Sequence, residues 1–212
     1  MAFARRLAFT ALAALGGTLL FLACADFDIW PLAWFGMLPW LYVILDGRCR
    51  SPFFYGFIAG LLGNGGGFYW INGLLQRFGH MRFYESAPIF LLLIGYQALE
   101  WAAFSWVLRK LRDHTKLPVT LLAPVSFVAL ELVTPFIFPW YFAITQAWVR
   151  PVIQIADLTG PLGVSFLLVL SNAALYETVM PLLRRERPSL RPLAAAAAVI
   201  ALALGYGQVR IR

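Results

Sequence analysis

Three glutamates interrupt apolar segments of this chain and are the first candidates for chemistry. An ionisable group at membrane depth is costly, so a carboxyl group there suggests a functional role. Glu177 lies seven residues before Arg184, and Glu100 about two turns before Arg109, so each has a basic residue near enough to neutralise it. Glu131 has no basic residue in the outer half of its segment. We expect Glu131 either to contact a substrate or to join a buried hydrogen-bonded network.

The other reactive side chains form no recognisable catalytic set. His80 and His114 fall on opposite faces of the predicted membrane arrangement, and Cys24 has no histidine in reach. The sequence has no metal-ligand spacing, no phosphate-binding glycine loop and no serine nucleophile beside a histidine and an aspartate. We therefore predict no catalytic residue, metal or cofactor on this chain. Cys24 and Cys49 should also lie on opposite faces, which argues against a disulfide.

Seven apolar segments must position these residues. Of the 212 residues 61% are hydrophobic and 13% charged, which leaves too little polar surface to coat a water-soluble globule. Each segment has roughly the 17–25 residues that a helix needs to cross the hydrocarbon layer. The expected helices are 7–25, 29–45, 52–75, 86–108, 117–138, 159–183 and 192–209. The fold class is an all-α membrane protein, a bundle of about seven transmembrane helices forming a single transmembrane domain over residues 1–212.

The basic residues set the orientation. With the N-terminus inside, twelve of the 17 Lys and Arg residues lie on the cytoplasmic side and five lie outside. This asymmetry predicts an N-in, C-out arrangement. The net charge of +7 then reflects topology and lipid headgroups, and it gives no support for nucleic-acid binding. The first segment imitates a lipoprotein signal peptide ending at Cys24, but Phe21 and Leu22 suit that cleavage site poorly, so we expect the segment to be retained.

The third segment is rich in glycine, with small-xxx-small pairs at Gly56/Gly60 and Gly63/Gly67. One interpretation is close helix packing alone. The other is that Gly65–Gly67 loosen the helix before an aromatic stretch that forms one wall of a lipid-accessible cavity. Many aromatic residues lie at the predicted outer boundary, where an interfacial belt explains most of them.

Four strings in order and in register resemble one family. They are Asp26–Leu32, Gly67–Asn72 running into Phe78–Met81, Phe138–Trp140 with Gln146, and Gly160–Leu168. Together they resemble the membrane half of bacterial apolipoprotein N-acyltransferase over essentially the whole chain. The resemblance implies a multi-pass protein of the bacterial inner (plasma) membrane that takes part in lipoprotein maturation. Its partners would be a membrane phospholipid, whose acyl chain is transferred, and an apolipoprotein, whose N-terminal cysteine receives it.

The chain departs from that family in two respects. The family's catalytic part is a periplasmic nitrilase-like domain with a Glu-Lys-Cys triad that follows the seventh helix, and this chain stops at 208–212, about where we expect that domain to begin. No catalytic residue is therefore carried over, and a separate nitrilase-like catalytic chain is the expected partner. The family also has an Arg-Gly pair soon after the matching glutamate, whereas Glu131 is followed by Leu132–Pro135. The alternatives are a non-catalytic lipid-binding or scaffold protein, and a truncated, inactive family member.

Because this resemblance implies a phospholipid substrate, we expect the protein to have a cleft that binds it. A long acyl chain needs an apolar groove that opens sideways to the bilayer, and its ester needs a few polar groups near the interface. We expect the outer ends of the third and fifth helices, with the loops after them, to form it. The predicted lining residues are Tyr69, Trp70, Asn72, Phe78, Phe138, Trp140 and Gln146, with Glu131 deeper below.

Overall fold

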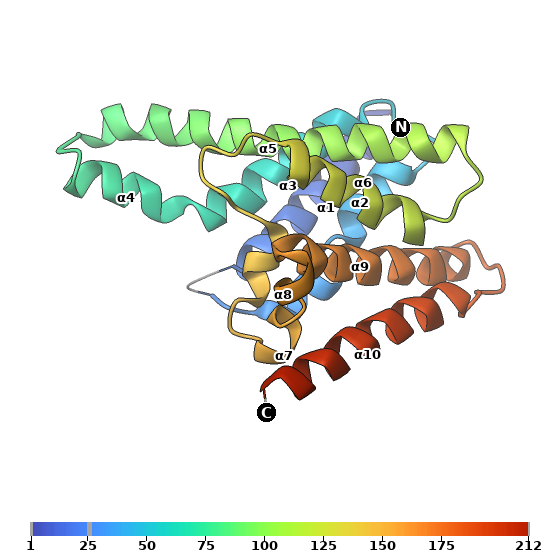
Figure 1. Cartoon of the computed structure of the whole chain (residues 1–212). Helices are drawn as coiled ribbons and strands as arrows, with labels where there is room; N and C mark the ends of the chain where they lie inside the picture. The colour runs from blue at the N-terminus through green and yellow to red at the C-terminus, as the bar shows by residue number, and fades with distance from the viewer. Residues whose placement is uncertain (1, 25–26, 212) are drawn as a thin grey trace.

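The computed structural model describes residues 2–24 and 27–211, and these residues are helical or irregular, with no strand among them. Residues 25 and 26, at the end of the expected first helix and the start of the first family motif, lie outside the described residues. Figure 1 shows a bundle of helices in which segments distant in sequence lie against one another. The all-α class is confirmed.

Within the part of the chain that the structure describes, four helices are long and apolar enough to cross a membrane. They are α1 (Ala2–Leu22), α5 (Phe83–His114), α9 (Pro161–Leu183) and α10 (Arg191–Ile211). The stretches Trp30–Leu45 and Val119–Val133 are apolar but shorter. These properties are those of a helical membrane protein, while the count of seven crossings and their orientation stay predictions.

Two of the expected helices are interrupted. The segment 29–45 consists of a short 3₁₀ helix, η1 (Trp30–Trp34), and α2 (Leu38–Leu45), and each has a proline in its first turn. Proline is tolerated there because the first N–H groups of a helix have no intrahelical partner. The segment 52–75 is α3 (Pro52–Gly67) followed by α4 (Tyr69–Arg77), which extends to Arg77. The break falls at Phe68, directly after the three glycines, as the second interpretation of that segment predicted.

The remaining boundaries also follow local chemistry. Helix α6 (Val119–Val133) ends short of residue 138 because Thr134 precedes Pro135 and is extended, with ψ 121°. Helix α5 extends beyond 86–108 at both ends, and its 32 residues measure about 48 Å. The stretch 139–158, expected to be a loop, contains η2 (Phe142–Gln146), α7 (Arg150–Ile153) and α8 (Ala156–Thr159).

The bundle core forms where α3 packs between α1 and α5, and where α6 packs against α9. Trp40 of α2 stacks on Trp101 of α5 with ring centroids 5.1 Å apart, and its indole N–H donates to Ser105 Oγ at 3.0 Å. A Cβ atom at Gly56 would lie 2.6 Å from the Trp101 carbonyl oxygen, and one at Gly60 would lie 2.9 Å from the Cα of Ala98. Close packing through the small-residue face of α3 is therefore confirmed.

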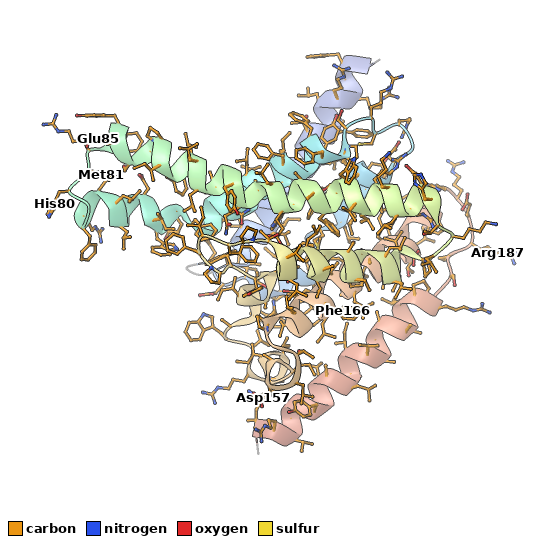
Figure 2. All side chains as sticks on the ribbon, turned by 45° about the horizontal axis from the view of Figure 1, so that its top comes forward. His80, Met81, Glu85, Asp157, Phe166 and Arg187 are labelled. Atoms are coloured by element: carbon orange, nitrogen blue, oxygen red, sulfur yellow. The ribbon has the colours of Figure 1, made fainter. Side chains whose placement is uncertain are left out.

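The molecule has two distinct ends. Helix α4 and the first part of α5 form a hairpin that projects beyond the bundle at the left of Figure 1. His80, Met81 and Glu85 lie at its tip, and Arg187, on the turn between α9 and α10, lies at the opposite end (Figure 2). The projecting hairpin is consistent with the length of α5, which exceeds the roughly 30 Å of a bilayer's hydrocarbon core.

Candidate functional site

Glu131 is the centre of a buried hydrogen-bonded network. Its side chain on α6 is 2% exposed, and its Oε1 accepts hydrogen bonds from the Phe142 backbone N–H at 2.7 Å and from the Ser165 hydroxyl at 3.1 Å. The Ser165 oxygen itself accepts a bond from the Ala143 N–H at 3.1 Å. One carboxyl group thus fastens the first turn of η2 to both α6 and α9, as expected if Glu131 serves a polar network.

The second oxygen of Glu131 borders a small interior cavity. Glu131 Oε2, Glu100 Oε1 and Asn64 Nδ2 are buried atoms without a hydrogen-bond partner, and all three residues line this cavity. Its volume is about 10 Å³, the room of roughly one water molecule. The cavity is polar enough to attract a water molecule and far too small for an acyl chain.

Neither of the other two glutamates has the partner expected from the sequence. Arg109 forms a salt bridge with Asp113 at 2.8 Å and donates to backbone carbonyls of the α2 end, so it does not neutralise Glu100. Glu177 accepts hydrogen bonds from the N–H groups of Val119 and Thr120 at 2.7 and 3.3 Å. It therefore caps the N-terminus of α6, where carboxylate oxygens satisfy free N–H groups and complement the helix dipole.

Several predicted cleft residues gather at the break between α3 and α4. The Trp140 ring packs on Phe68, with centroids 4.7 Å apart, and a Cβ atom at Gly67 would lie 2.6 Å from it. Phe138 lies 6.4 Å from Phe68, and the Trp70 indole N–H donates to the Gly67 carbonyl at 3.1 Å. Phe68 is fully buried, whereas Trp70 and Phe138 are exposed. We name Phe138 and Trp140, whose rings contact Phe68, and Trp70, which is bonded to Gly67, the aromatic wall.

The other predicted lining residues are not part of the aromatic wall. Asn72 Oδ1 accepts a hydrogen bond from the Ser86 hydroxyl at 2.8 Å and so ties α4 to α5, and Phe78 is 78% exposed at the end of α4, beside the hairpin turn. Tyr69 is exposed beside the break. Gln146 is fully buried, its Oε1 accepts from the Trp34 indole N–H, and its Nε2 donates to the Trp30 carbonyl, both at 3.1 Å. Of the eight predicted residues, Glu131 and Trp140 line the small cavity.

Sequence reasoning missed polar residues that join helices. Besides Ser165, one of them is Asn172 of α9, which is fully buried. Its Nδ2 donates to the Ala33 carbonyl at 2.8 Å, and its Oδ1 accepts from the Met37 N–H at 2.9 Å, so it fastens the turn between η1 and α2 to α9. The signal available in the sequence was an isolated amide or hydroxyl side chain inside an apolar segment, where an unsatisfied polar group is costly.

Space of the size that an acyl chain fills lies on the side of the bundle. An apolar groove of about 490 Å³ runs between α8, α9 and α10 and includes Leu162, Phe166 and Leu202 among its lining residues. Figure 2 places Phe166 on α9, close to α10. The aromatic wall and this groove are therefore candidate contacts for a long apolar ligand, as is a groove of about 530 Å³ between α5 and α6.

The reactive groups outside the apolar helices look structural. Asp46 accepts hydrogen bonds from the Arg48 guanidinium, with a shortest contact of 2.7 Å, and this bond holds the pKa of the Asp46 carboxyl below its ordinary value. Burial raises the pKa of the Cys49 thiol, which makes it a poor nucleophile. Cys24 and Cys49 are free and buried. Among the described residues, no three His, Cys, Asp or Glu side chains are grouped so that they could hold a metal ion.

Comparison with known proteins identifies relatives over most of the chain. A family model described as the apolipoprotein N-acyltransferase N-terminal domain matches residues 16–174. The apolipoprotein N-acyltransferase of Geobacter metallireducens is 31% identical over 207 residues, which are 94% of this chain and 39% of that protein. Those of Pseudomonas putida and Haemophilus influenzae are 30% and 26% identical, over 93% and 84% of this chain and 39% and 34% of their own lengths. The chain therefore spans about two fifths of the length of the curated relatives it matches.

Proposed function

Because the chain belongs to the apolipoprotein N-acyltransferase family, in its N-terminal domain, we propose that it is the membrane part of a lipoprotein-maturation N-acyltransferase of the bacterial inner membrane. The observation that carries the proposal is the family match over residues 16–174. In the reaction, the ester of a phospholipid acyl chain breaks and an amide forms on the N-terminal cysteine of a diacylated apolipoprotein. The amine gives up a proton, and the lipid leaves as a lysophospholipid with a free hydroxyl.

The described residues do not supply the groups that the chemistry needs. Acyl transfer through a covalent intermediate requires a nucleophile with a base and an orienting group. Cys24 and Cys49 are buried, and although Cys24 lines the small cavity with Glu100 and Glu131, its thiol donates to the Leu20 carbonyl at 3.4 Å and not to either carboxyl group. We propose that a separate periplasmic nitrilase-like chain supplies the catalytic triad, while this chain presents the lipid.

The aromatic wall is the proposed lipid contact. Trp70 and Phe138 expose 44% and 43% of their surfaces beside the break after α3. Broad aromatic rings beside the helix break suit contact with an acyl chain near the headgroup layer, where aromatic side chains are favoured. Glu131 and Gln146 support this region because their hydrogen bonds hold η2, which begins two residues after Trp140. In this proposal they position the wall, and Tyr69, Asn72 and Phe78 extend it along the hairpin.

A reconstitution tests the proposed division of labour. The purified chain, in nanodiscs with phospholipid and a diacylated lipopeptide, should give no triacylated product on its own. Adding a nitrilase-like chain encoded beside it should produce the triacylated peptide, measured by mass spectrometry. Product from the chain alone that survives Cys24→Ala and Cys49→Ala would contradict the proposal. If the two chains bind each other and the lipid but form no product, the chain is a lipid-binding scaffold.

A second experiment tests the wall. The double variant Trp70→Ala/Phe138→Ala should raise the KM for phospholipid in the two-chain reaction by roughly tenfold, because buried aromatic contacts dominate binding energies. Trp106→Ala is a matched control, since Trp106 is 50% exposed on α5 but lies apart from the wall. A photoreactive acyl chain should label the wall. Labelling confined to Leu202 would instead indicate that the lipid binds in the groove between α9 and α10.

A further inference from the structure

A second concave surface lies at the opposite end of the bundle from the hairpin. It is a pocket of about 400 Å³ between the first turns of α1 and the loop from α2 to α3. Its lining combines guanidinium groups with aromatic and hydroxyl side chains. The lining residues are Arg5, Arg6, Phe9, Thr10, Arg48, Arg50, Ser51, Phe54 and Tyr55.

The pocket carries an excess of positive charge that the protein leaves largely unpaired. Its four arginines come from two segments about forty residues apart in the sequence, so the fold brings them together. Asp46 is the acidic residue of these segments, and it pairs with Arg48. Among the described residues, Arg5, Arg6 and Arg50 have no salt bridge. Clustered basic residues of this kind attract a phosphate group.

The start of α3 adds to the positive potential. Ser51 is the N-cap residue, yet its side chain makes no capping hydrogen bond, and the first turn of α3 holds no acidic residue. The backbone N–H groups of a helix start favour an anion in front of them. The N-terminus of α3 and the arginines therefore act on the same space.

The apolar part of the pocket indicates what kind of phosphate it takes. Phe9 and Tyr55 are buried and meet edge to face with centroids 5.8 Å apart, whereas Phe54 is 53% exposed at the pocket. A free phosphate ion has no apolar surface that could pack on these rings. A phospholipid carries its phosphate next to glycerol and acyl carbons, which could. Basic pockets between membrane helices on the cytoplasmic side suit anionic lipid headgroups.

We propose that this pocket binds the headgroup of an anionic phospholipid in the leaflet where α1 begins. Arg6 and Arg50, one from each segment, hold the phosphate, and Phe54 contacts the lipid above it. The site is separate from the aromatic wall, and it stands whether or not the chain takes part in acyl transfer.

Native mass spectrometry of the 212-residue chain in neutral detergent tests the site, with phosphatidylglycerol as the probe. One molecule should bind more tightly than the rest, and Arg6→Gln/Arg50→Gln should weaken that binding roughly 25-fold, about fivefold for each charge removed. Arg187→Gln/Arg191→Gln removes the same charge from another loop and should leave the binding unchanged. The affinity should also fall with rising salt.

Three results would overturn the proposal. The control variant could lose as much affinity as the test variant, which would mean general charge attraction. Phosphatidylcholine could bind the wild-type chain as tightly, which would remove the role of net charge. Inorganic phosphate could displace the lipid at equal concentration, which would make the pocket a site for free phosphate. The comparisons with phosphatidylcholine and with inorganic phosphate use the wild-type chain, so they test the proposal even if the double variant fails to fold.

Discussion

A carboxyl group keeps its place inside an apolar bundle because its neighbours supply hydrogen bonds. Glu131 receives them from a backbone N–H on η2 and from a hydroxyl on α9, so the group that looked like a substrate contact also joins three elements. Glu177 does the same at the other end of α6 by accepting bonds from its first N–H groups. Both residues show that a carboxyl group in an apolar helix can accept hydrogen bonds from backbone N–H groups that have no helical partner.

Glu131→Ala should destabilise the protein by about 2–3 kcal/mol, because it leaves two buried donors without an acceptor. Glu131→Gln keeps an oxygen for Phe142 and Ser165 and should cost less than about 1 kcal/mol. Denaturant unfolding in detergent micelles, followed by tryptophan fluorescence, measures both. Equal stability of the Ala and Gln variants would mean that the network contributes nothing.

The Asp46 pair predicts a dependence on pH. The pKa of Asp46 is lowered in the folded protein by its hydrogen bond with Arg48, so the ionised carboxylate stabilises the fold. This stabilisation is complete above the unfolded pKa near 4 and disappears as the pH falls through the lower folded value. Asp46→Asn should melt about 2 °C or less below the wild type at pH 7. The difference should narrow as the pH falls below about 4, and a gap that grows in acid would contradict the pairing.

At the scale of the helices, glycine acts in two ways along α3. Gly56 and Gly60 allow α5 to approach, and Gly65–Gly67 are followed by the break at Phe68. The break brings Trp140 against Gly67, where a side chain would collide with the indole ring. Glycine therefore allows close packing in the first half of this segment and precedes the helix break at its end, while the lipid-accessible cavity stays a prediction.

A pair of matched substitutions separates these effects from helix propensity. Gly56→Ala should destabilise the protein by about 1–3 kcal/mol, because its methyl group would overlap the Trp101 carbonyl and Ser105 of α5. Gly95→Ala in α5 adds a methyl group with nothing within 4 Å and should be neutral or stabilising by up to about 1 kcal/mol. Thermal unfolding of both variants in the same detergent gives the comparison. A harmless Gly56→Ala would mean that α3 and α5 can separate without cost.

At the scale of the whole molecule, the two ends differ in chemistry. The turn that holds Arg187 lies at one end, and the projecting hairpin with its exposed Phe78 and Phe83 lies at the other. This separation agrees with the asymmetry of basic residues, which predicts that the Arg187 end faces the cytoplasm. The proposed anionic-lipid pocket and the proposed aromatic wall would then contact opposite leaflets.

Reporter fusions test the predicted N-in, C-out arrangement. A reporter that is active only in the periplasm should work after Arg212, and one that is active only in the cytoplasm should work after Arg187. A cytoplasmic reporter active after Arg212 would reduce the number of crossings and would place a periplasmic catalytic partner out of reach of the C-terminus.

The sequence by itself determined the helical class, the apolar segments and several of their ends. Hydrophobic length and glycine act over neighbouring residues, as where Gly65–Gly67 precede Phe68. The expected helix 117–138, however, runs past Val133, where α6 ends before Pro135. The sequence also missed the division of 29–45 into η1 and α2, and the short helices between 142 and 159. A proline can either start or stop a helix, and packing against other segments decides which.

Tertiary structure alone decided the partners of the buried polar groups. Ser165 reaches Glu131 across 34 residues, Gln146 reaches Trp34 across 112, and Asn172 reaches Met37 across 135. The sequence marked Glu131 and Gln146 but could not say that their hydrogen bonds hold η2 in place. A polar side chain in an apolar helix must find a partner, but which one it finds depends on the rotation and crossing of helices far apart in the chain.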